Sequence, residues 1–463
     1  MLFNSYIFIF AFLPVTLLVF FLLGHAGRLQ VASAWLVLMS LVFYGWWNPV
    51  YLGLIGASMV FNYQVGVALG RRTGGSAPAQ RLLALGVGAD LLLLAYYKYA
   101  NFFVDNWNAL GGAPIGLGEI VLPLGISFFT FTQIAYLVDA YRCEAREYNP
   151  LHYALFVTYF PHLIAGPILH HSEMMPQFDK SSIYRFNVEH FTAGCVYFLM
   201  GLFKKVVIAD SISAFASPVF GAAAAGGTLS AADAWGGALA YTFQLYFDFS
   251  GYSDMAVGLA MMMGVRLPLN FNSPYKATNI SDFWRRWHMT LSRFLRDYLY
   301  IALGGNRRGA GRRYVNLFLT MLLGGLWHGA GWTFVIWGLM NGIGIVLVRL
   351  TPWQMPLLAA RAVTFTSATI LWVWFRAVSV PDAWRMTGTM LGRDGFTALL
   401  PLPEKPMLLV MTGALLFAWL VPNSQKLLER SLWTPLWRVA LGVLLALSIA
   451  SFEHASEFLY FNF

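Results

Sequence analysis

The chain has 463 residues, of which 58% are hydrophobic and only 11% are charged. A soluble domain carries about 25% charged residues. This composition, with many apolar runs of about 20 residues, therefore predicts an integral membrane protein. Two cysteines, Cys143 and Cys195, cannot build a disulfide framework or a thiolate zinc site. The formal net charge of +9 could suggest a nucleic-acid partner, but basic cytoplasmic loops explain it better in a membrane protein.

Twelve apolar windows predict the membrane-spanning helices. We expect eleven or twelve spans, because several windows are shorter than the roughly 20 residues that a span needs. No charged segment precedes the first window and no clear cleavage site follows it, so we expect a retained helix and not a removed signal peptide. The windows are 2–23, 31–47, 51–69, 82–97, 119–141, 190–209, 232–262, 314–327, 331–349, 360–376, 406–421 and 437–452.

A further apolar segment, 151–169, is interrupted by Pro161, Gly166 and Pro167. Irregular backbone at membrane depth is tolerated only where protein or a water-filled cavity covers it, so this segment predicts a re-entrant element. Basic residues gather in alternate loops, most densely within 264–313, which predicts that these loops are cytoplasmic and that the N-terminus lies outside. Lys204 and Lys205 fit this orientation poorly, and we expect them to snorkel or the span to be misplaced.

The segment 281–303, SDFWRRWHMTLSRFLRDYLYIAL, carries four arginines and cannot be a spanning helix. Its apolar residues recur at spacings of three and four, which predicts one amphipathic helix that lies at the cytoplasmic interface or enters the bundle from that side. Ser281 and Asp282 are its expected N-caps.

His328 lies between two apolar stretches, in the run YVNLFLTMLLGGLWHGAGWTFVIWGLMNGIGIVLVR (314–349). An ionisable residue at membrane depth indicates a functional site, and a desolvated neutral imidazole suits a general base or an acyl-accepting nucleophile. The alternative is a core histidine that bonds a backbone carbonyl. The surrounding glycines, Gly324, Gly325, Gly329 and Gly331, permit the close approach of another backbone or a ligand, or simply tight helix packing.

His288 lies on the predicted amphipathic helix, beside Trp287. It is either an interfacial histidine on the polar edge of that helix or a neutral imidazole that faces a cytoplasmic opening.

Asp248 and Asp254 fall within the apolar run YFDFSGYSDMAVGLA (246–260). Carboxylates in hydrocarbon need partners, and the arginines of 285–296 are the expected ones. A structural ion pair is the favoured interpretation, ahead of catalysis or a proton path.

A second basic feature is the loop GGNRRG (304–309), which contains Asn306 and Arg307. Together with Arg285 and Arg286 it could hold phosphate groups, although the positive-inside bias explains the same charges without a ligand.

Several long blocks, in this order along the chain, resemble the membrane-bound O-acyltransferase family, and within it the bacterial alginate O-acetyltransferase branch. The blocks are FPHLIAGPI (160–168), YFDFSGYSDMA (246–256), NFNSPY (270–275), ISDFWRRWHMTLSRFLRDYLYIALGGNR (280–307), LWHGAGWTFVIWG (326–338) and FLYFNF (458–463). The chain departs from the family at His162, where glutamine is more frequent, and near His170, where arginine is.

The resemblance implies an all-α polytopic membrane protein of one domain, 1–463, with its catalytic core roughly at 120–350 and its helices around a tunnel. It implies that His328 is the catalytic histidine and His288 the second active-site histidine. We expect Trp327, Arg285, Arg286, Asn306, Arg307, Asp248 and Asp254 to line the donor or substrate path. No metal or cofactor is expected beyond acetyl-CoA as the acyl donor.

The implied function is transfer of an acetyl group from cytoplasmic acetyl-CoA, through the bacterial inner membrane, to an extracytoplasmic polysaccharide, directly or through a periplasmic acetyltransferase partner. D-alanyl transfer from a carrier protein is an alternative within the same family. A proton-coupled transporter or glycan exporter that relays protons through Asp248, Asp254 and the membrane histidines is an alternative from another class. A haem or metal protein built on several of the histidines is a third.

Overall fold

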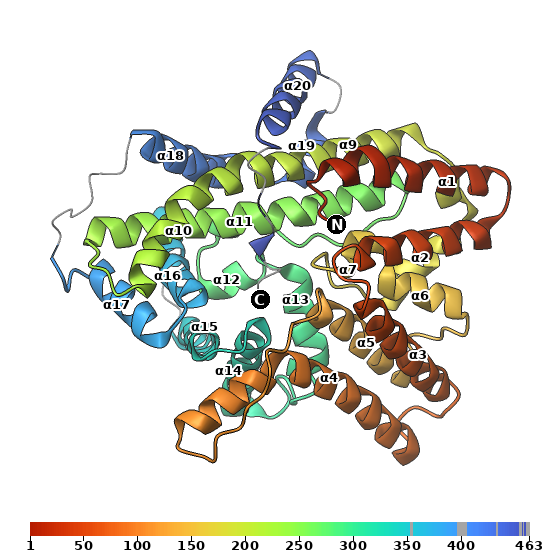
Figure 1. The fold of residues 1–463 in the computed structure, drawn as a ribbon, viewed down its shortest axis with the longest axis horizontal. Coiled ribbons are helices and arrows are strands. Elements are labelled where there is room, and N and C mark those ends of the chain that lie inside the picture. Colours follow the sequence, from red (N-terminus) through yellow and green to blue (C-terminus); the bar gives the residue numbers. More distant parts are fainter. Residues whose placement is uncertain (352–354, 396–404, 432–433, 453–455, 457, 460–463) are drawn as a thin grey trace. The chain divides into compact units, whose positions relative to one another are not determined.

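The computed structural model describes residues 1–351, 355–395, 405–431, 434–452, 456 and 458–459. Within these residues the secondary structure is helical, without a strand. The prediction of an all-α polytopic membrane protein is confirmed. Figure 1 shows the order of the helices along the chain.

Each of the twelve apolar windows overlaps a helix, but only six of the described helices or continuous helical segments are long and apolar enough to cross a membrane. The number is lower than the eleven or twelve spans that we expected, because the other described helices are too short or not apolar enough. The six are Phe8–His25, Tyr51–Gly70, Ala77–Ala109, Val188–Ala224, Trp332–Leu350 and Leu357–Arg376.

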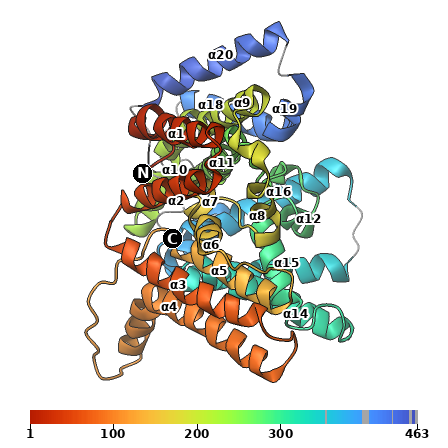
Figure 2. The ribbon, with the colours of Figure 1, turned by 90° about the vertical axis from the view of Figure 1, so that its right-hand side faces the viewer.

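The chain packs as two compact units, which leaves open the prediction of a single catalytic domain. The first unit comprises Met1–Phe198 and Tyr252–Pro268. Its antiparallel helices α1 and α2 lie side by side in Figures 1 and 2, and α5 is buried along almost its whole length. Its elements are η1 (Phe8–Phe12), α1 (Leu13–His25), α2 (Leu29–Gly45), α3 (Tyr51–Gly70), α4 (Ala77–Ala109), α5 (Ile126–Tyr141), α6 (Pro150–Thr158), α7 (Phe160–Leu163), α8 (His171–Phe178), η2 (Ser181–Tyr184) and most of α9 (Val188–Leu202).

The segment 151–169 is broken and buried, as its prolines predicted. Helix α6 ends before Tyr159, whose backbone leaves the helical region (φ −48°, ψ 107°), and α7 adds a single turn. A Cβ on Gly166 would lie 2.3 Å from Cα of His162, so only glycine fits the turn that follows. Whether this element is re-entrant stays a prediction.

The second unit comprises Leu199–Gly251 and Leu269–Phe463. It contains both predicted catalytic histidines. Its elements are η3 (Phe203–Ala209), α10 (Asp210–Ala224), the first part of α11 (Ala231–Met262), η4 (Pro274–Lys276), α12 (Ile280–Trp284), α13 (Met289–Phe294), η5 (Leu295–Tyr300), α14 (Gly309–His328), α15 (Trp332–Leu350), α16 (Leu357–Arg376), α17 (Val380–Met390), α18 (Lys405–Leu420), α19 (Ser424–Ser431) and α20 (Pro435–Ala450).

Helices α14 and α15 make the most extensive helix–helix contact among the described residues of this unit, and they lie side by side in Figures 1 and 2. Glycines make the approach possible, since a Cβ on Gly325 would lie 2.7 Å from Cα of Gly338 and 2.5 Å from the carbonyl oxygen of Phe334. Gly325 therefore serves the close approach of another backbone in tight helix packing. This packing fixes the end of α14, where His328 lies.

Candidate functional site

The prediction of a single helix over 281–303 is wrong, because the backbone breaks around His288. Helix α12 ends at Trp284, α13 begins at Met289, and His288 between them adopts a left-handed conformation (φ 43°, ψ 55°). A side-chain-bearing residue in that region costs on the order of 1–3 kcal/mol, and such residues cluster at functional sites. The predicted N-caps are also wrong, because Asn279 is the N-cap and accepts a hydrogen bond from the backbone N–H of Asp282.

Asn270 holds this break in place from 18 residues away. Its carbonyl oxygen accepts from the backbone N–H of Met289 at 2.9 Å. Its side-chain Oδ1 lies 2.9 Å from His288 Nδ1, and also accepts from the hydroxyl (3.0 Å) and the backbone N–H (3.4 Å) of Thr290. Asn270 carries no signal of its own in the sequence beyond its place in the block NFNSPY.

These contacts determine the tautomer of His288. The backbone N–H of Thr290 is a donor only, so the Asn270 atom that it contacts is the amide oxygen, an acceptor. His288 Nδ1 must then donate, and in the neutral ring Nε2 carries the lone pair. The contacts of Asn270 thus hold Nε2 of His288, which can accept a proton, at a defined position.

His288 lies outside the six candidate spans and is fully buried. Burial lowers its pKa from 6.5 to about 3, so the ring is neutral at physiological pH. The ring of Phe249 meets the imidazole edge-on at 4.8 Å. The ring is therefore neutral and buried, which excludes an interfacial ring on a polar edge, and the cytoplasmic opening that we expected it to face stays a prediction.

His328 is the last residue of α14 and is 3% exposed. Aromatic rings surround it, with centroid distances of 4.8 Å to Trp327, 5.2 Å to Trp337 and 5.2 Å to Phe375. Next to it, Gly329 lies under the ring of Phe334, where a Cβ would approach within 2.1 Å. The imidazole is held in one orientation by packing.

The structure brings His288, Trp327 and His328 together. The ring centroid of the Trp327 indole lies 4.8 Å from that of the His328 imidazole and 6.4 Å from that of the His288 imidazole. Three residues that the sequence predicted for one site thus occupy one place, although 40 positions separate the two histidines in the chain.

Asp248 has a different partner from the one expected. Its carboxylate lies 2.7 Å from Nζ of Lys205, not beside an arginine of 285–296, and accepts from the backbone N–H of Leu459 at 3.0 Å. Lys205 also binds Asp210 at 2.7 Å and is 2% exposed, so it does not snorkel. The favoured structural ion pair is confirmed for Asp248, but with Lys205. Asp254 is buried in the first unit, and its predicted arginine partner stays a prediction.

The predicted phosphate-binding residues lie at the surface. Arg285 and Arg307 are exposed. Arg286 is half-buried, with its Nε 3.0 Å from Asp282, and Asn306 accepts a hydrogen bond from the hydroxyl of Tyr300. No described contact joins these residues to the two histidines.

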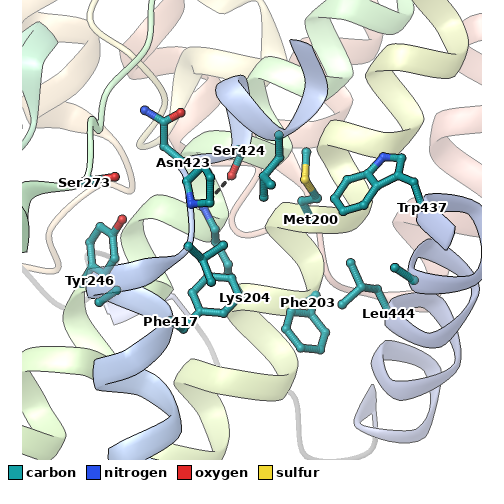
Figure 3. Close-up of a pocket in the computed structure, with 15 residues that line it drawn as sticks. Met200, Phe203, Lys204, Tyr246, Ser273, Phe417, Asn423, Ser424, Trp437 and Leu444 are labelled. Atoms are coloured by element: carbon teal, nitrogen blue, oxygen red, sulfur yellow. Dashed lines mark hydrogen bonds between the residues drawn. The ribbon is translucent and has the colours of Figure 1, made fainter. Parts of the chain in front are cut away.

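A cavity of about 200 Å³ lies elsewhere in the second unit, between η3, α11 and the helices α18 to α20 (Figure 3). Its wall is mostly apolar, and Nζ of Lys204 donates to Oγ of Ser424 at 2.7 Å on one side. Tyr246 lines the cavity and contacts Trp287, the neighbour of His288, at 6.2 Å. The cavity therefore approaches the histidine site through two aromatic side chains.

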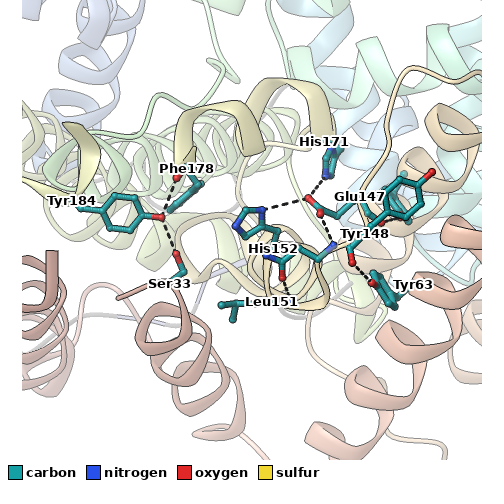
Figure 4. Close-up of polar contacts among 11 residues, drawn as sticks. Ser33, Tyr63, Glu147, Tyr148, Leu151, His152, His171, Phe178 and Tyr184 are labelled. Atoms are coloured by element: carbon teal, nitrogen blue, oxygen red, sulfur yellow. Dashed lines mark hydrogen bonds and ion pairs between the residues drawn. The ribbon is translucent and has the colours of Figure 1, made fainter. Parts of the chain in front are cut away.

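The first unit contains a separate polar cluster (Figure 4). Oε2 of Glu147 lies 3.2 Å from Nε2 of His171 and 3.7 Å from Nδ1 of His152. Burial alone would raise the pKa of Glu147, but hydrogen bonds from His171 and the backbone of Asn149, with the charges of both histidines, lower it below 4.5. Among the described residues no cluster of histidine, cysteine and carboxylate ligands could hold a metal ion.

His162 and His170, which the sequence analysis placed at or near departures from the family pattern, also lie in the first unit. His162 donates from Nε2 to the carbonyl of Phe156 at 2.9 Å, and burial lowers its pKa to about 4. Nδ1 of His170 lies 3.5 Å from a carboxylate oxygen of Asp139. His162 thus corresponds to a core histidine that bonds a backbone carbonyl.

Comparisons with known proteins agree with one another. The profile of the membrane-bound O-acyltransferase family matches residues 32–378. The chain is 47% identical over 429 residues to a peptidoglycan O-acetyltransferase of Helicobacter pylori, which spans 85% of this chain and 80% of the relative. It is 45% identical over 436 residues to the probable alginate O-acetylase AlgI of Pseudomonas aeruginosa, an alignment that spans 91% of this chain and 80% of the relative. A teichoic acid D-alanyltransferase of Bacillus subtilis is 30% identical over 230 residues, which span 48% of this chain and 57% of the relative.

Proposed function

Because the chain belongs to the membrane-bound O-acyltransferase family and is a multi-pass membrane acyltransferase, we propose that it transfers an acetyl group from cytoplasmic acetyl-CoA, through the membrane, to hydroxyl groups of an extracytoplasmic polysaccharide. The relatives named for acetyl transfer are 47% and 45% identical over most of the chain, whereas the D-alanyl relative is 30% identical over 48% of it. This difference favours an acetyl group over a D-alanyl group as the group that is transferred. Alginate and peptidoglycan, the polymers in the names of the relatives, both suggest a glycan acceptor.

The proposed location is the inner membrane of a bacterium, since acetyl-CoA is made in the cytoplasm and the acceptor lies outside it. The acetyl group passes either directly to the glycan or to a periplasmic acetyltransferase partner. We propose that residues 1–463 act as one catalytic membrane domain, with the core at roughly 120–350.

The observation that carries this proposal is the pair of buried imidazoles that contact the indole of Trp327. In the proposed reaction the acceptor hydroxyl oxygen attacks the thioester carbonyl, a C–O bond forms and the C–S bond breaks. An imidazole nitrogen of His328 takes the hydroxyl proton, and the leaving thiolate is then protonated to the thiol of CoA. General base catalysis of this kind contributes roughly 10²–10⁴-fold in rate.

A second route through the same residue is covalent. A ring nitrogen of His328 attacks the thioester carbonyl first, so that an N–C bond forms, the C–S bond breaks and the thiolate leaves to be protonated to the thiol of CoA. The acceptor hydroxyl oxygen then attacks the acetyl carbonyl, a C–O bond forms and the N–C bond breaks, and the hydroxyl proton passes to the freed ring nitrogen. In either route His288 positions the donor or relays a proton through Nε2, because its Nδ1–H is bound to Asn270.

The donor must displace aromatic side chains to reach His328, since Trp327, Trp337 and Phe375 enclose the ring. Closed aromatic walls exclude water and so protect the thioester from hydrolysis until the donor is bound. The phosphates of CoA carry several negative charges, and we propose that Arg285, Arg286, Asn306 and Arg307 bind them at the surface. Asp248 has no part in this binding, because Lys205 holds it.

The test is acetylation of the polysaccharide by cells that express His328→Ala or the unaltered chain at matched membrane levels. We expect a loss of at least about 10²-fold with the variant. Near-normal acetylation would reject the assignment. Purified protein with labelled acetyl-CoA, in parallel with flux into proteoliposomes without donor, separates acyl transfer from transport.

A further inference from the structure

A buried cluster of charges in the second unit has more negative than positive groups. Nζ of Lys205 lies 2.7 Å from Oδ1 of both Asp210 and Asp248, and the three side chains are 2–3% exposed. One ammonium group cannot neutralise two carboxylates. Because an uncompensated buried charge is strongly destabilising, the cluster requires further hydrogen-bond donors.

Those donors come from more than 200 residues further along the chain, from Ser456 and Leu459. The backbone N–H and the hydroxyl of Ser456 donate to Asp210 at 3.2 Å and 2.7 Å, and the backbone N–H of Leu459 donates to Asp248 at 3.0 Å. Nζ of Lys205 donates to the hydroxyl of Ser456 at 3.0 Å. We call Ser456, Phe458 and Leu459 the tail segment. Charge-assisted hydrogen bonds are among the strongest in proteins, so the cluster and the tail segment hold each other in place.

Phe458 lies between the two anchoring residues of the tail segment and is 2% exposed. Its ring packs against Phe249 at 5.7 Å. Phe249 follows Asp248 directly, and its ring meets the imidazole of His288 edge-on at 4.8 Å. A continuous set of contacts therefore runs from the charge cluster through Phe458 and Phe249 to His288.

Phe249 also supports the segment that fixes the histidine tautomer. Its ring packs at 5.0 Å against Phe271, the neighbour of Asn270, whose side chain binds His288. Displacement of Phe249 would thus loosen His288 on two sides, at its ring and at its hydrogen-bond partner. The sequence block FLYFNF, which nothing in the proposed reaction uses, contains Phe458 and Leu459.

We propose that the tail segment is a positioning element of the acyl-transfer site, which holds Phe249 against His288 and keeps that imidazole in its productive orientation. This inference rests on the proposed function, in which His288 serves the reaction. The competing explanation is that the tail segment only stabilises the fold.

The test compares Phe458→Ala with Phe220→Ala in the full-length chain, purified in nanodiscs. Phe220 is a matched control, because it is a buried phenylalanine of the same unit that packs on Tyr241. Hydrogen–deuterium exchange at the imidazole C2 carbon, followed by mass spectrometry, reports the exposure of His288, with His328 as an internal reference. We expect exchange at His288 to rise roughly tenfold in Phe458→Ala and to stay unchanged in Phe220→Ala. Acetyl transfer should fall in kcat, with little change in KM for acetyl-CoA.

Equal effects of the two variants on His288 exchange, at matched unfolding temperatures, would overturn the proposal. So would an unchanged exchange rate in Phe458→Ala. If that variant does not fold, Ser456→Ala removes hydrogen bonds of the cluster while it keeps the ring, and the same comparison applies to it. The exchange measurement needs no donor or acceptor. A chain that shows the exchange difference but transfers no acetyl group would refute the proposed function and leave the positioning contact established.

Discussion

Replacement of Asn270 by alanine tests the geometry of the histidine site most directly. The change removes the Oδ1 atom that accepts from His288 Nδ1 at 2.9 Å and from the hydroxyl of Thr290 at 3.0 Å. The imidazole N–H then stays buried without this acceptor, which costs about 1–3 kcal/mol. The same contacts hold His288 in its left-handed conformation, so part of the cost appears as altered ring orientation.

This free energy gives the expected kinetic effect. If the lost interaction is made fully in the transition state, 1–3 kcal/mol corresponds to a fall in kcat of roughly 5- to 150-fold. Asn270→Asp should lose less, because a carboxylate oxygen can still accept from Nδ1. Its negative charge should also raise the pKa of His288 from the value of about 3 that burial imposes.

The assay is transfer of labelled acetyl from acetyl-CoA by purified protein in nanodiscs, with the unfolding temperature of each variant measured in parallel. Asn272→Ala is the matched control, since Asn272 lies two residues further on and its Oδ1 accepts from Asn423 and not from His288. A normal kcat in Asn270→Ala would refute this role of the Asn270 side chain, as would a fall in kcat for Asn270→Asp and Asn272→Ala as large as that for Asn270→Ala.

Two further predictions concern stability. Gly325→Ala should lower the free energy of unfolding by about 1–3 kcal/mol, because its Cβ would lie 2.7 Å from Cα of Gly338 across the α14–α15 contact. Gly344→Ala on α15 would make an ordinary 3.4 Å contact and should be nearly neutral, so equal unfolding temperatures for the two variants would contradict the packing argument. Glu147→Gln should reduce stability at pH 7 and flatten its acid dependence. The partners of Glu147, chiefly His171, hold its pKa below 4.5, so its contribution is present above that pH and is lost as the pH falls through the folded-state pKa. Thermal unfolding between pH 3 and 7 checks this, and an unaltered acid limb in the variant would refute it.

The sequence by itself determined the class of the protein and the identity of the main candidate residues. Apolar windows predict helices because the hydrophobicity of each residue determines which stretch, or which face of a helix, is buried away from water. Ionisable residues among them, such as His328 and Asp248, stand out for the same reason, since burial of a charge is costly wherever it occurs. The family resemblance, carried by blocks around His288 and His328, added the expectation that the two belong to one site.

Only the tertiary structure decided which polar and charged groups pair with one another. The helix break at His288 was invisible because the three–four spacing of 281–303 continues through it, whereas Asn270, 18 residues away, stabilises it. Lys205 and not a nearby arginine pairs with Asp248, and the backbone N–H of Leu459 donates to Asp248 from 211 residues further on. Periodicity reports which side of an element is buried, but ion pairs and hydrogen bonds depend on distances across the folded chain, which no local pattern contains.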